Sequence, residues 1–293
     1  MSGQLTYIVA SMRPQQWIKN LFLFAALVFS GNLFNSGDIL LVVSGFLIFS
    51  CTASGIYLFN DVADIEKDKL HPTKSLRPLP SGKLSTATAT LASTFLIAFG
   101  VVAAFFLTIS FGITVLLYAV LNVLYSLKLK DVVILDVMTI SAGFVLRVIG
   151  GALLINVPTS EWLIICTILL SLFLGFSKRR HEIMVLEGDA NSHRAVLEHY
   201  SLYFLDQMIG IVTASTVMSY ALYTISEETV RKFGTAHLIY TVPFVLYGIF
   251  RYLYLVHKKE EGGNPTKLAL TDRPLLINII LWIIVASYII YKR

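Results

Sequence analysis

Three aspartates, Asp61, Asp64 and Asp68, follow directly after a long apolar run that ends at Phe59. Their spacings of three and four residues allow one face of a helix to present all three side chains. Carboxylates that cluster in this way at the end of a hydrophobic helix are the ligands that Mg²⁺ ions require when they bridge a diphosphate. The spacing therefore predicts a Mg²⁺ site formed by these aspartates at the mouth of a membrane helix.

Basic side chains follow in the same polar stretch, which covers residues 60–82. Lys74 and Arg77 lie within reach of phosphate oxygens bound at the aspartates. An acidic helix face followed by a basic loop indicates an enzyme that handles a diphosphate substrate. A solvated helix end with capping aspartates is the simpler alternative for such a charged loop.

The elements that must hold this loop are membrane helices. The chain has 293 residues, of which 56% are hydrophobic and 14% are charged, and its mean hydropathy is +0.74. Soluble domains carry about 25% charged residues, so we expect an all-α integral membrane protein with one membrane domain over residues 1–293. Apolar segments of spanning length predict nine transmembrane helices, near 20–34, 39–59, 85–108, 110–127, 133–155, 161–177, 205–225, 236–256 and 274–291.

The distribution of charge predicts which side of the membrane the aspartates face. Lysines and arginines concentrate in the long loops 60–84, 178–204 and 257–273, whereas the alternate loops are short. The positive-inside rule places these basic loops in the cytoplasm, so this topology accounts for much of the net charge of +5 without nucleic acid. The two cysteines, Cys51 and Cys166, lie inside apolar runs and offer no disulfide or zinc framework.

The aspartates and the basic loop together form a recognisable pattern. The sequence reads Asn60-Asp61-x-x-Asp64-x-x-x-Asp68 and then Arg77-Pro78-x-x-Ser81-Gly82. It resembles the UbiA-type superfamily of intramembrane prenyltransferases, whose first motif is NDxxDxxxD followed by RPxxSG. The resemblance implies a nine-helix bundle in a prokaryotic plasma membrane, a Mg²⁺ cofactor, catalytic roles for Asp61 and Asp64, and substrate contact by Asn60.

The loop after the sixth predicted span differs from the aromatic-accepting members of that superfamily. Those members carry a second DxxxD-like motif there, whereas this chain has Lys178-Arg179-Arg180-His181-Glu182 and later Tyr200-Ser201-x-x-x-Leu205-Asp206-Gln207. The pattern resembles the branch that attaches phosphoribose to a polyprenyl phosphate. A positive-inside anchor is the alternative for the three cations.

The chemistry of such a donor fits these residue types. Phosphoribosyl pyrophosphate carries a 5-phosphate besides its diphosphate, and arginines suit bidentate phosphate binding. We expect Lys178, Arg179, Arg180, Tyr200 and Gln207 to contact substrate. Asp206 would complete the metal site or hold ribose hydroxyls, and its alternative is a carboxylate stabilised by a helix dipole.

Two further cations are candidates for substrate contact. Arg147 lies inside the span 133–155, where an unpaired charge costs several kcal/mol, so it should face a cavity and a partner. A lipid phosphate is one candidate partner; a buried ion pair, for which Asp136 lies eleven positions earlier, is the other. Lys19 follows an interfacial Trp17, and either a phosphate contact or simple anchoring would explain it.

The resemblance implies transfer of 5-phosphoribose from phosphoribosyl pyrophosphate to a decaprenyl-like polyprenyl phosphate. Two alternatives stay open at this stage. An aromatic prenyltransferase would join a polyprenyl diphosphate to an acceptor such as 4-hydroxybenzoate, and a non-catalytic transporter would explain the spans but not the aspartate loop. Gly143, Gly150 and Gly151 would allow close helix packing within one chain or between copies in an oligomer.

Overall fold

The computed structural model describes residues 2–70, 73–186, 195–259, 263 and 265–292, and these residues form helices and no strands. The long helices are α3 (Ser36–Ala63), α5 (Thr86–Leu107), α6 (Ile109–Leu127), α7 (Leu135–Leu154), α8 (Glu161–Leu186), α9 (Leu202–Ile225), α11 (Val242–Lys258) and α13 (Arg273–Tyr291). The short α-helices are α1 (Ser2–Ser11), α2 (Phe24–Phe29), α4 (Ile65–Lys69), α10 (Glu227–Phe233) and α12 (Pro265–Thr271). Five 3₁₀ segments join them: η1 (Pro14–Leu23), η2 (Lys74–Leu76), η3 (Leu129–Asp131), η4 (Ala195–His199) and η5 (His237–Thr241).

Eight helices within the described residues are long and apolar enough to cross a membrane, so the chain is a multi-pass membrane protein. The sequence predicts nine, and the difference is the segment 20–34. This segment forms the end of η1 and the six-residue α2 instead of a spanning helix. Its fifteen residues are short of the roughly 20 that a bilayer requires. Polar side chains also fix η1 to the bundle, because Trp17 donates to Ser54 and Asn20 donates to Ser50.

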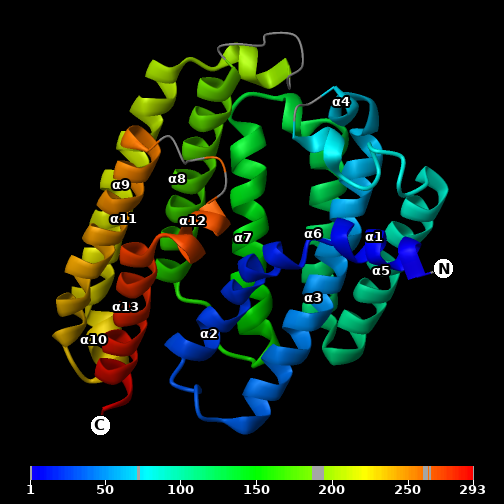
Figure 1. Cartoon of the computed structure of the whole chain (residues 1–293). Helices are drawn as coiled ribbons and strands as arrows, with labels where there is room; N and C mark the ends of the chain where they lie inside the picture. Colours follow the sequence, from blue (N-terminus) through cyan, green and yellow to red (C-terminus); the bar gives the residue numbers. More distant parts are fainter. Residues whose placement is uncertain (1, 71–72, 187–194, 260–262, 264, 293) are drawn as a thin grey trace.

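The long helices form two groups that share α7. In Figure 1, α3, α5 and α6 lie on one side of α7, and α8, α9, α11 and α13 lie on the other. One apolar core joins α3, α6, α7 and the η1–α2 segment, and a second core joins α7 to α8, α9, α11 and α13. Gly151 explains how closely η1 approaches α7, since a Cβ at this position would lie 2.0 Å from the Leu23 carbonyl oxygen.

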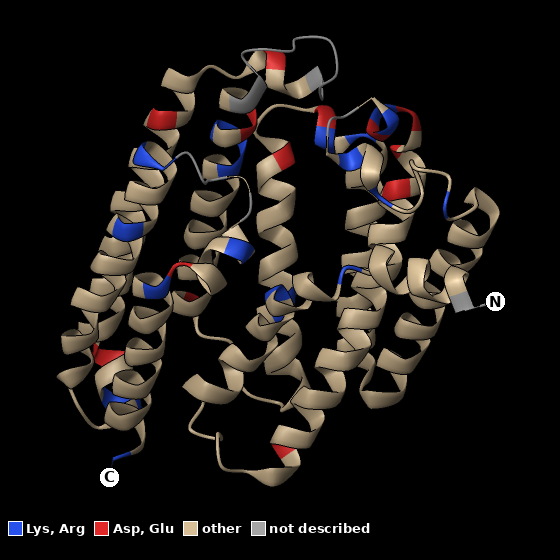
Figure 2. Cartoon of the chain, viewed as in Figure 1, with Lys and Arg blue, Asp and Glu red and all other residues tan. Residues whose placement is uncertain are grey.

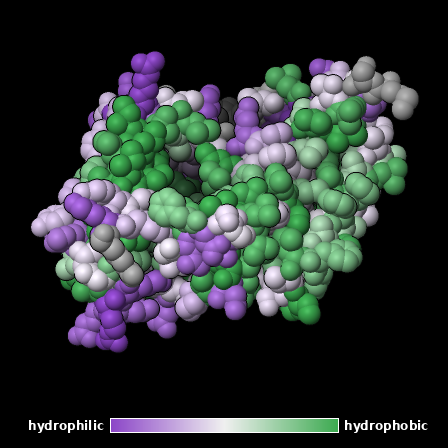
Figure 3. Space-filling view, turned by 90° about the horizontal axis from the view of Figure 1, so that it is seen from below, coloured by the Kyte–Doolittle hydropathy of each residue, from purple (hydrophilic) through white to green (hydrophobic). Residues whose placement is uncertain are grey.

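Charged residues gather at one end of this bundle. Figure 2 shows that acidic and basic positions cluster around the α3–α4 junction and the end of α8 at the top of the view. We call this the charged end. Viewed from below, apolar residues cover much of the molecule and hydrophilic residues interrupt them (Figure 3). Large apolar side chains such as Phe106 and Leu91 are exposed along the flanks, as expected for helices that contact lipid.

Candidate functional site

The three aspartates lie at the charged end, but on two helices. Asp61 is in the last turn of α3, Asp64 is the residue at which α3 ends, and Asp68 is in the short helix α4. The single continuous helix face expected from the spacing is therefore interrupted at Asp64. All three residues are nonetheless buried, with 1%, 8% and 3% of their surfaces exposed. Buried carboxylates require nearby positive charge.

Arg77 supplies part of that charge. Its Nη1 donates to Asp61 Oδ1 at 3.1 Å and to Asp68 Oδ2 at 2.7 Å, so one guanidinium joins α3 to α4. Arg13, at the start of η1, also donates to Asp61. Burial lowers the pKa of Arg77, and the nearby Arg13 lowers it further. The loop that carries Arg77 turns at Gly82, whose φ of +77° suits glycine.

Each of the other two aspartates has a lysine partner. Lys130 Nζ donates to Asp64 Oδ1 at 2.5 Å, and Lys130 is itself only 4% exposed. The Lys130 side chain is therefore directed to the aspartates and does not anchor at the membrane surface. Lys74 Nζ lies 3.7 Å from Asp68 Oδ1. The aspartate loop is therefore neutralised by four basic residues from three separate segments of the chain.

The side chains of the aspartate loop offer the oxygen ligands that a hard cation prefers. No three His, Cys, Asp or Glu side chains converge closely enough to hold a metal ion in the part of the chain that the structure describes. The carboxylates of the loop, however, offer only oxygen ligands, which Mg²⁺ prefers. Asn60 adds one more, because its buried Oδ1 has no hydrogen-bond partner among the described residues. Asp61, Asp64, Asp68 and Asn60 are thus suited to Mg²⁺ once the basic side chains move aside.

The second predicted cluster separates into a buried part and an accessible part. Arg179 is 1% exposed and donates to Asp136 (2.6 Å), Glu182 (2.5 Å) and Tyr125 (3.2 Å). The Tyr200 hydroxyl donates to Asp136 at 2.7 Å and accepts from the Ile134 amide. Burial and the Asp136 contact raise the pKa of Tyr200. Arg179 and Tyr200 therefore hold α7, α8 and the 195–201 segment together here.

Arg180 and Asp206 form the second part, in which Asp206 is the accessible member because the Arg180 side chain is only 11% exposed. Arg180 Nε donates to Asp206 Oδ1 at 2.6 Å, which joins α8 to the first turns of α9. The Asp206 side chain remains 39% exposed, and the neighbouring Gln207 is exposed as well. Lys178 is 39% exposed and lies 3.7 Å from Glu182. The structure thus brings Asp206 to a cation on α8 rather than to the aspartates at the α3–α4 junction.

Arg147 lies deeper in the bundle, about 16 Å along α7 from Asp136 at 1.5 Å per residue. Its Nε donates to Asn20 Oδ1 at 2.7 Å and its Nη2 donates to the Tyr118 hydroxyl at 3.0 Å. The guanidinium also lies over the rings of Phe49, Tyr118 and Phe144. Asp136 is paired with Arg179 instead, so the predicted alternative of an Asp136–Arg147 ion pair is wrong.

A second cation, Lys19 in η1, lies near Arg147. Burial and the charges of Arg147 and Arg13 lower the pKa of Lys19 to about 8. Among the described residues, no carboxylate forms an ion pair with Lys19 or Arg147. Two neighbouring cations with no acidic partner in the described part of the chain produce a positive potential that favours an anion.

Arg13 and Lys130 are the site residues that sequence reasoning missed. Both lie far from the aspartate loop in sequence, yet both contact it directly. A weak signal exists for Lys130, since the short polar segment 128–131 falls at the same end of its span as the aspartates. Arg13 precedes Pro14 at the start of η1 and has a positive φ of 54°, which no sequence pattern here predicts.

Comparison of the sequence with known proteins identifies the family to which this chain is similar. Residues 20–289 match the UbiA prenyltransferase family. The chain is 31% identical to a decaprenyl-phosphate phosphoribosyltransferase of Mycolicibacterium smegmatis over 94% of this chain and 90% of the relative. It is 32% identical to the enzyme of that name from Corynebacterium glutamicum, over 96% and 87%.

The fold has a solved counterpart. A UbiA homolog from Archaeoglobus fulgidus bound to GPP and Mg²⁺ superimposes with a TM-score of 0.73 at 17% identity, covering 98% of this chain and all of that one. At this level of identity the likeness concerns the fold alone. The family match over most of the chain goes further: this protein belongs to the UbiA prenyltransferase family and is a membrane-embedded transferase.

Proposed function

We propose that this chain transfers 5-phosphoribose from phosphoribosyl pyrophosphate to a decaprenyl-like polyprenyl phosphate and releases pyrophosphate. The observation that carries the proposal is the end of α8, where Lys178 and Arg180 stand in place of a second aspartate pair. Cations there suit a donor with an additional phosphate group. The names of the relatives from M. smegmatis and C. glutamicum support the same reaction.

Asp61, Asp64, Asp68 and Asn60 would hold Mg²⁺ at the diphosphate of the donor. When bound, the metal would supply positive charge against the negative charge of the departing pyrophosphate. Arg77 and Lys74 already contact the aspartates, so they need only a short movement to donate to phosphate oxygens. Charge-assisted hydrogen bonds of this kind are stronger than neutral ones.

The donor's remaining groups would extend toward α8 and α9. Arg180 and Lys178 would bind the 5-phosphate, and Asp206 would accept hydrogen bonds from ribose hydroxyls. Arg179 would contribute indirectly, since all three of its guanidinium nitrogens donate to Asp136, Glu182 and Tyr125. It would fix the end of α8 on which Arg180 is carried.

The acceptor phosphate would meet Lys19 and Arg147. One of its oxygens attacks C1 of ribose as the bond from C1 to the pyrophosphate oxygen breaks, and the pyrophosphate leaves with the bonding electrons. The phosphate oxygen is already anionic, so the step needs no strong general base. Catalysis would rest on positioning the two substrates and stabilising their charge.

The charged end would face the cytoplasm of a prokaryotic cell at its plasma membrane. The concentration of lysine and arginine in the loops of that end supports this orientation. Phosphoribosyl pyrophosphate is a polyanion that does not cross the bilayer, so the donor site should open on the side where the donor is made.

A direct assay tests the proposal. The purified chain in lipid nanodiscs would receive labelled phosphoribosyl pyrophosphate with a polyprenyl phosphate, and in parallel a prenyl diphosphate with 4-hydroxybenzoate. We expect a labelled lipid product and pyrophosphate only from the first pair, and loss of both with chelator. Prenylated hydroxybenzoate from the second pair would overturn the proposal in favour of an aromatic prenyltransferase.

A further inference from the structure

Arg13 lies where the N-terminal segment crosses α3, next to the aspartates. In Figure 1, α1 and η1 pass across α3, and Arg13 directly precedes η1. Its guanidinium donates to Asp61 and also lies over the ring of Tyr57, one turn earlier in α3, at 5.3 Å from the ring centroid. The Arg13 side chain is 26% exposed. It is therefore a partly exposed cation in direct contact with the aspartate site.

Contacts on both sides of Arg13 hold it in this position. Side chains of α1 pack against an apolar cluster that includes Leu79 and Leu84, and on the other side Trp17 donates to Ser54 of α3 at 3.0 Å. Between these contacts, the backbone of Arg13 has a φ of 54°. This left-handed conformation is unfavourable for a residue other than glycine, and such conformations concentrate at functional sites.

Two guanidinium groups share one carboxylate oxygen here. Arg13 and Arg77 both donate to Asp61 Oδ1. Burial lowers the pKa of Arg77, and the charge of Arg13 lowers it further, so the two cations lie close enough to repel each other. With Lys74 and Lys130 included, four cations pair with the three aspartates in the described part of the chain. The excess of positive charge favours an anion.

Arg13 also lies near the cations that would bind the acceptor. Burial lowers the pKa of Lys19, and the charges of Arg147 and Arg13 lower it further. The same Arg13 guanidinium donates to Asp61. Arg13 thus connects the cations around the aspartates with the pair formed by Lys19 and Arg147.

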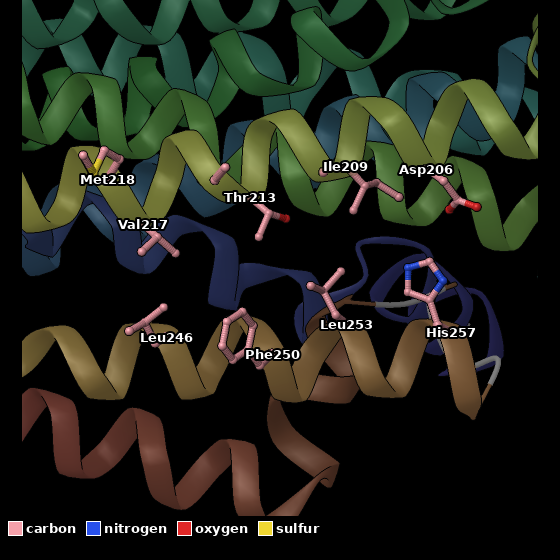
Figure 4. A pocket seen from close by; sticks show the side chains of 11 residues that line it. Asp206, Ile209, Thr213, Val217, Met218, Leu246, Phe250, Leu253 and His257 are labelled. Atoms are coloured by element: carbon pink, nitrogen blue, oxygen red, sulfur yellow. The ribbon is translucent and has the colours of Figure 1, made fainter.

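The cation at the end of α8 has different neighbours. Arg180 pairs with Asp206, and Asp206 lies beside His257 at one end of an apolar groove of about 450 Å³ between α9 and α11 (Figure 4). These helices lie on the opposite side of α7 from α3 (Figure 1). Arg13, on the α3 side, is therefore better situated than Arg180 to act between the aspartates and Lys19.

We propose that Arg13 is a catalytic residue that binds the departing pyrophosphate of the donor and the phosphate of the acceptor together at the point of transfer. The identity of the two ligands rests on the proposed function, whereas the intermediate position of Arg13 rests on its own contacts. Its guanidinium is free to turn to both anions once Asp61 is taken up by a divalent cation. A guanidinium carries five N–H donors in a planar fork, so it can donate to two anions at once.

This contact would lower the barrier to transfer in two ways. The two reacting groups are both anionic and repel each other as the acceptor oxygen approaches C1 of ribose, and a cation between them offsets that repulsion. The pyrophosphate also gains negative charge as its bond to C1 breaks, and a fixed donor stabilises this charge. Arg13 keeps its proton throughout, because a guanidinium stays charged at neutral pH.

The test measures how one ligand affects the binding of the other. Arg13→Gln removes the charge, and Arg13→Lys retains it without the planar fork. Lys83→Gln is the matched control, since it removes one cation from an exposed position beside the aspartate loop. Calorimetry on the full-length chains in nanodiscs would give the Kd of a polyprenyl phosphate with and without pyrophosphate and Mg²⁺. Thermal unfolding would be recorded in parallel.

We expect the acceptor Kd of Arg13→Gln to rise about ten-fold or more when pyrophosphate is bound, the effect of losing one charge-assisted hydrogen bond. Without pyrophosphate the rise should be much smaller, because Arg13 then stays on Asp61. Arg13→Lys should recover part of the loss, and Lys83→Gln should resemble the original chain. The kcat for phosphoribosyl transfer should fall about 100-fold in Arg13→Gln, as for the loss of one donor to a developing anion.

An acceptor Kd that changes equally with and without pyrophosphate would overturn the inference. So would a lower unfolding temperature of Arg13→Gln as the sole effect, because Arg13 would then serve only as a structural partner of Asp61. Binding of the two ligands that is coupled through Arg13, in a chain that does not transfer phosphoribose, would instead refute the proposed function and leave the double phosphate contact intact.

Discussion

Lys130 Nζ donates to Asp64 Oδ1 at 2.5 Å although 66 residues separate the two in sequence. The lysine follows α6, and the aspartate ends α3, so this pair ties the two helices together at the charged end. Both side chains are largely buried. The ion pair offsets the free-energy cost of burying the negative charge of Asp64.

Removal of Lys130 should therefore destabilise the fold. Lys130→Met leaves a buried carboxylate without its partner, a change that typically costs about 3–5 kcal/mol. We expect a lower unfolding temperature in detergent, and a larger stabilisation by added Mg²⁺ than in the original chain, because the metal then replaces the missing charge. An Asp64→Asn, Lys130→Met double variant that loses as much stability as the sum of the two single variants would contradict the pairing.

Asp64→Asn should abolish transfer in a chain that still folds, with a lower unfolding temperature because the buried Lys130 loses its carboxylate partner. The amide retains the shape of the side chain but loses the charge that a metal ligand needs, so we expect a loss of activity of at least about 100-fold, equivalent to about 2.7 kcal/mol of transition-state stabilisation. Phosphoribosyl transfer would be measured beside thermal unfolding. Glu66→Gln is the matched control, since this acid in α4 has a 79% exposed side chain that pairs with Lys69. Retained Mg²⁺-dependent activity in Asp64→Asn would refute the metal assignment.

The two adjacent arginines of α8 should respond differently to substitution. Arg180→Ala removes the cation that pairs with the exposed Asp206 and should raise the KM for phosphoribosyl pyrophosphate about ten-fold or more, the effect of losing one charge-assisted hydrogen bond. Arg179→Ala should instead lower the unfolding temperature, because Asp136 is 0% exposed and would lose its cation. Initial-rate kinetics and thermal unfolding separate the two effects. Equal kinetic losses with unchanged stability in both variants would argue against this division.

The binding of the acceptor should weaken above about pH 8. The pKa of Lys19 is lowered to about 8, so a rise in pH through this value removes a positive charge near Arg147. We expect the KM for the lipid acceptor to increase between pH 7 and pH 9 on this account. Lys19→Arg, whose guanidinium stays charged over this range, should flatten the profile. A pH profile identical in both proteins would exclude Lys19 as its source.

Structural features that depend on a single continuous stretch of the chain were predictable from the sequence. The apolar runs predict most of the spanning helices, and the spacing of Asp61, Asp64 and Asp68 predicts that they share one end of the bundle. The break at Asp64 was not predictable, because it depends on how α4 folds back toward Arg77. The partners of Asp64 and Asp136 were not predictable either, since Lys130 and Arg179 reach them only after distant helices pack. Whether the predicted site residues act as assigned stays a prediction.

The contacts of Arg77 with the aspartates couple the binding of Mg²⁺ to the binding of the diphosphate donor in the proposed reaction. Its guanidinium holds Asp61 and Asp68 together, so a cation entering between these carboxylates must displace it, and the displaced guanidinium becomes available to a diphosphate. Each ligand would then increase the affinity for the other by the same factor, because such coupling is reciprocal. Positive cooperativity between magnesium and the donor would thus follow from the contacts of Arg77 with Asp61 and Asp68.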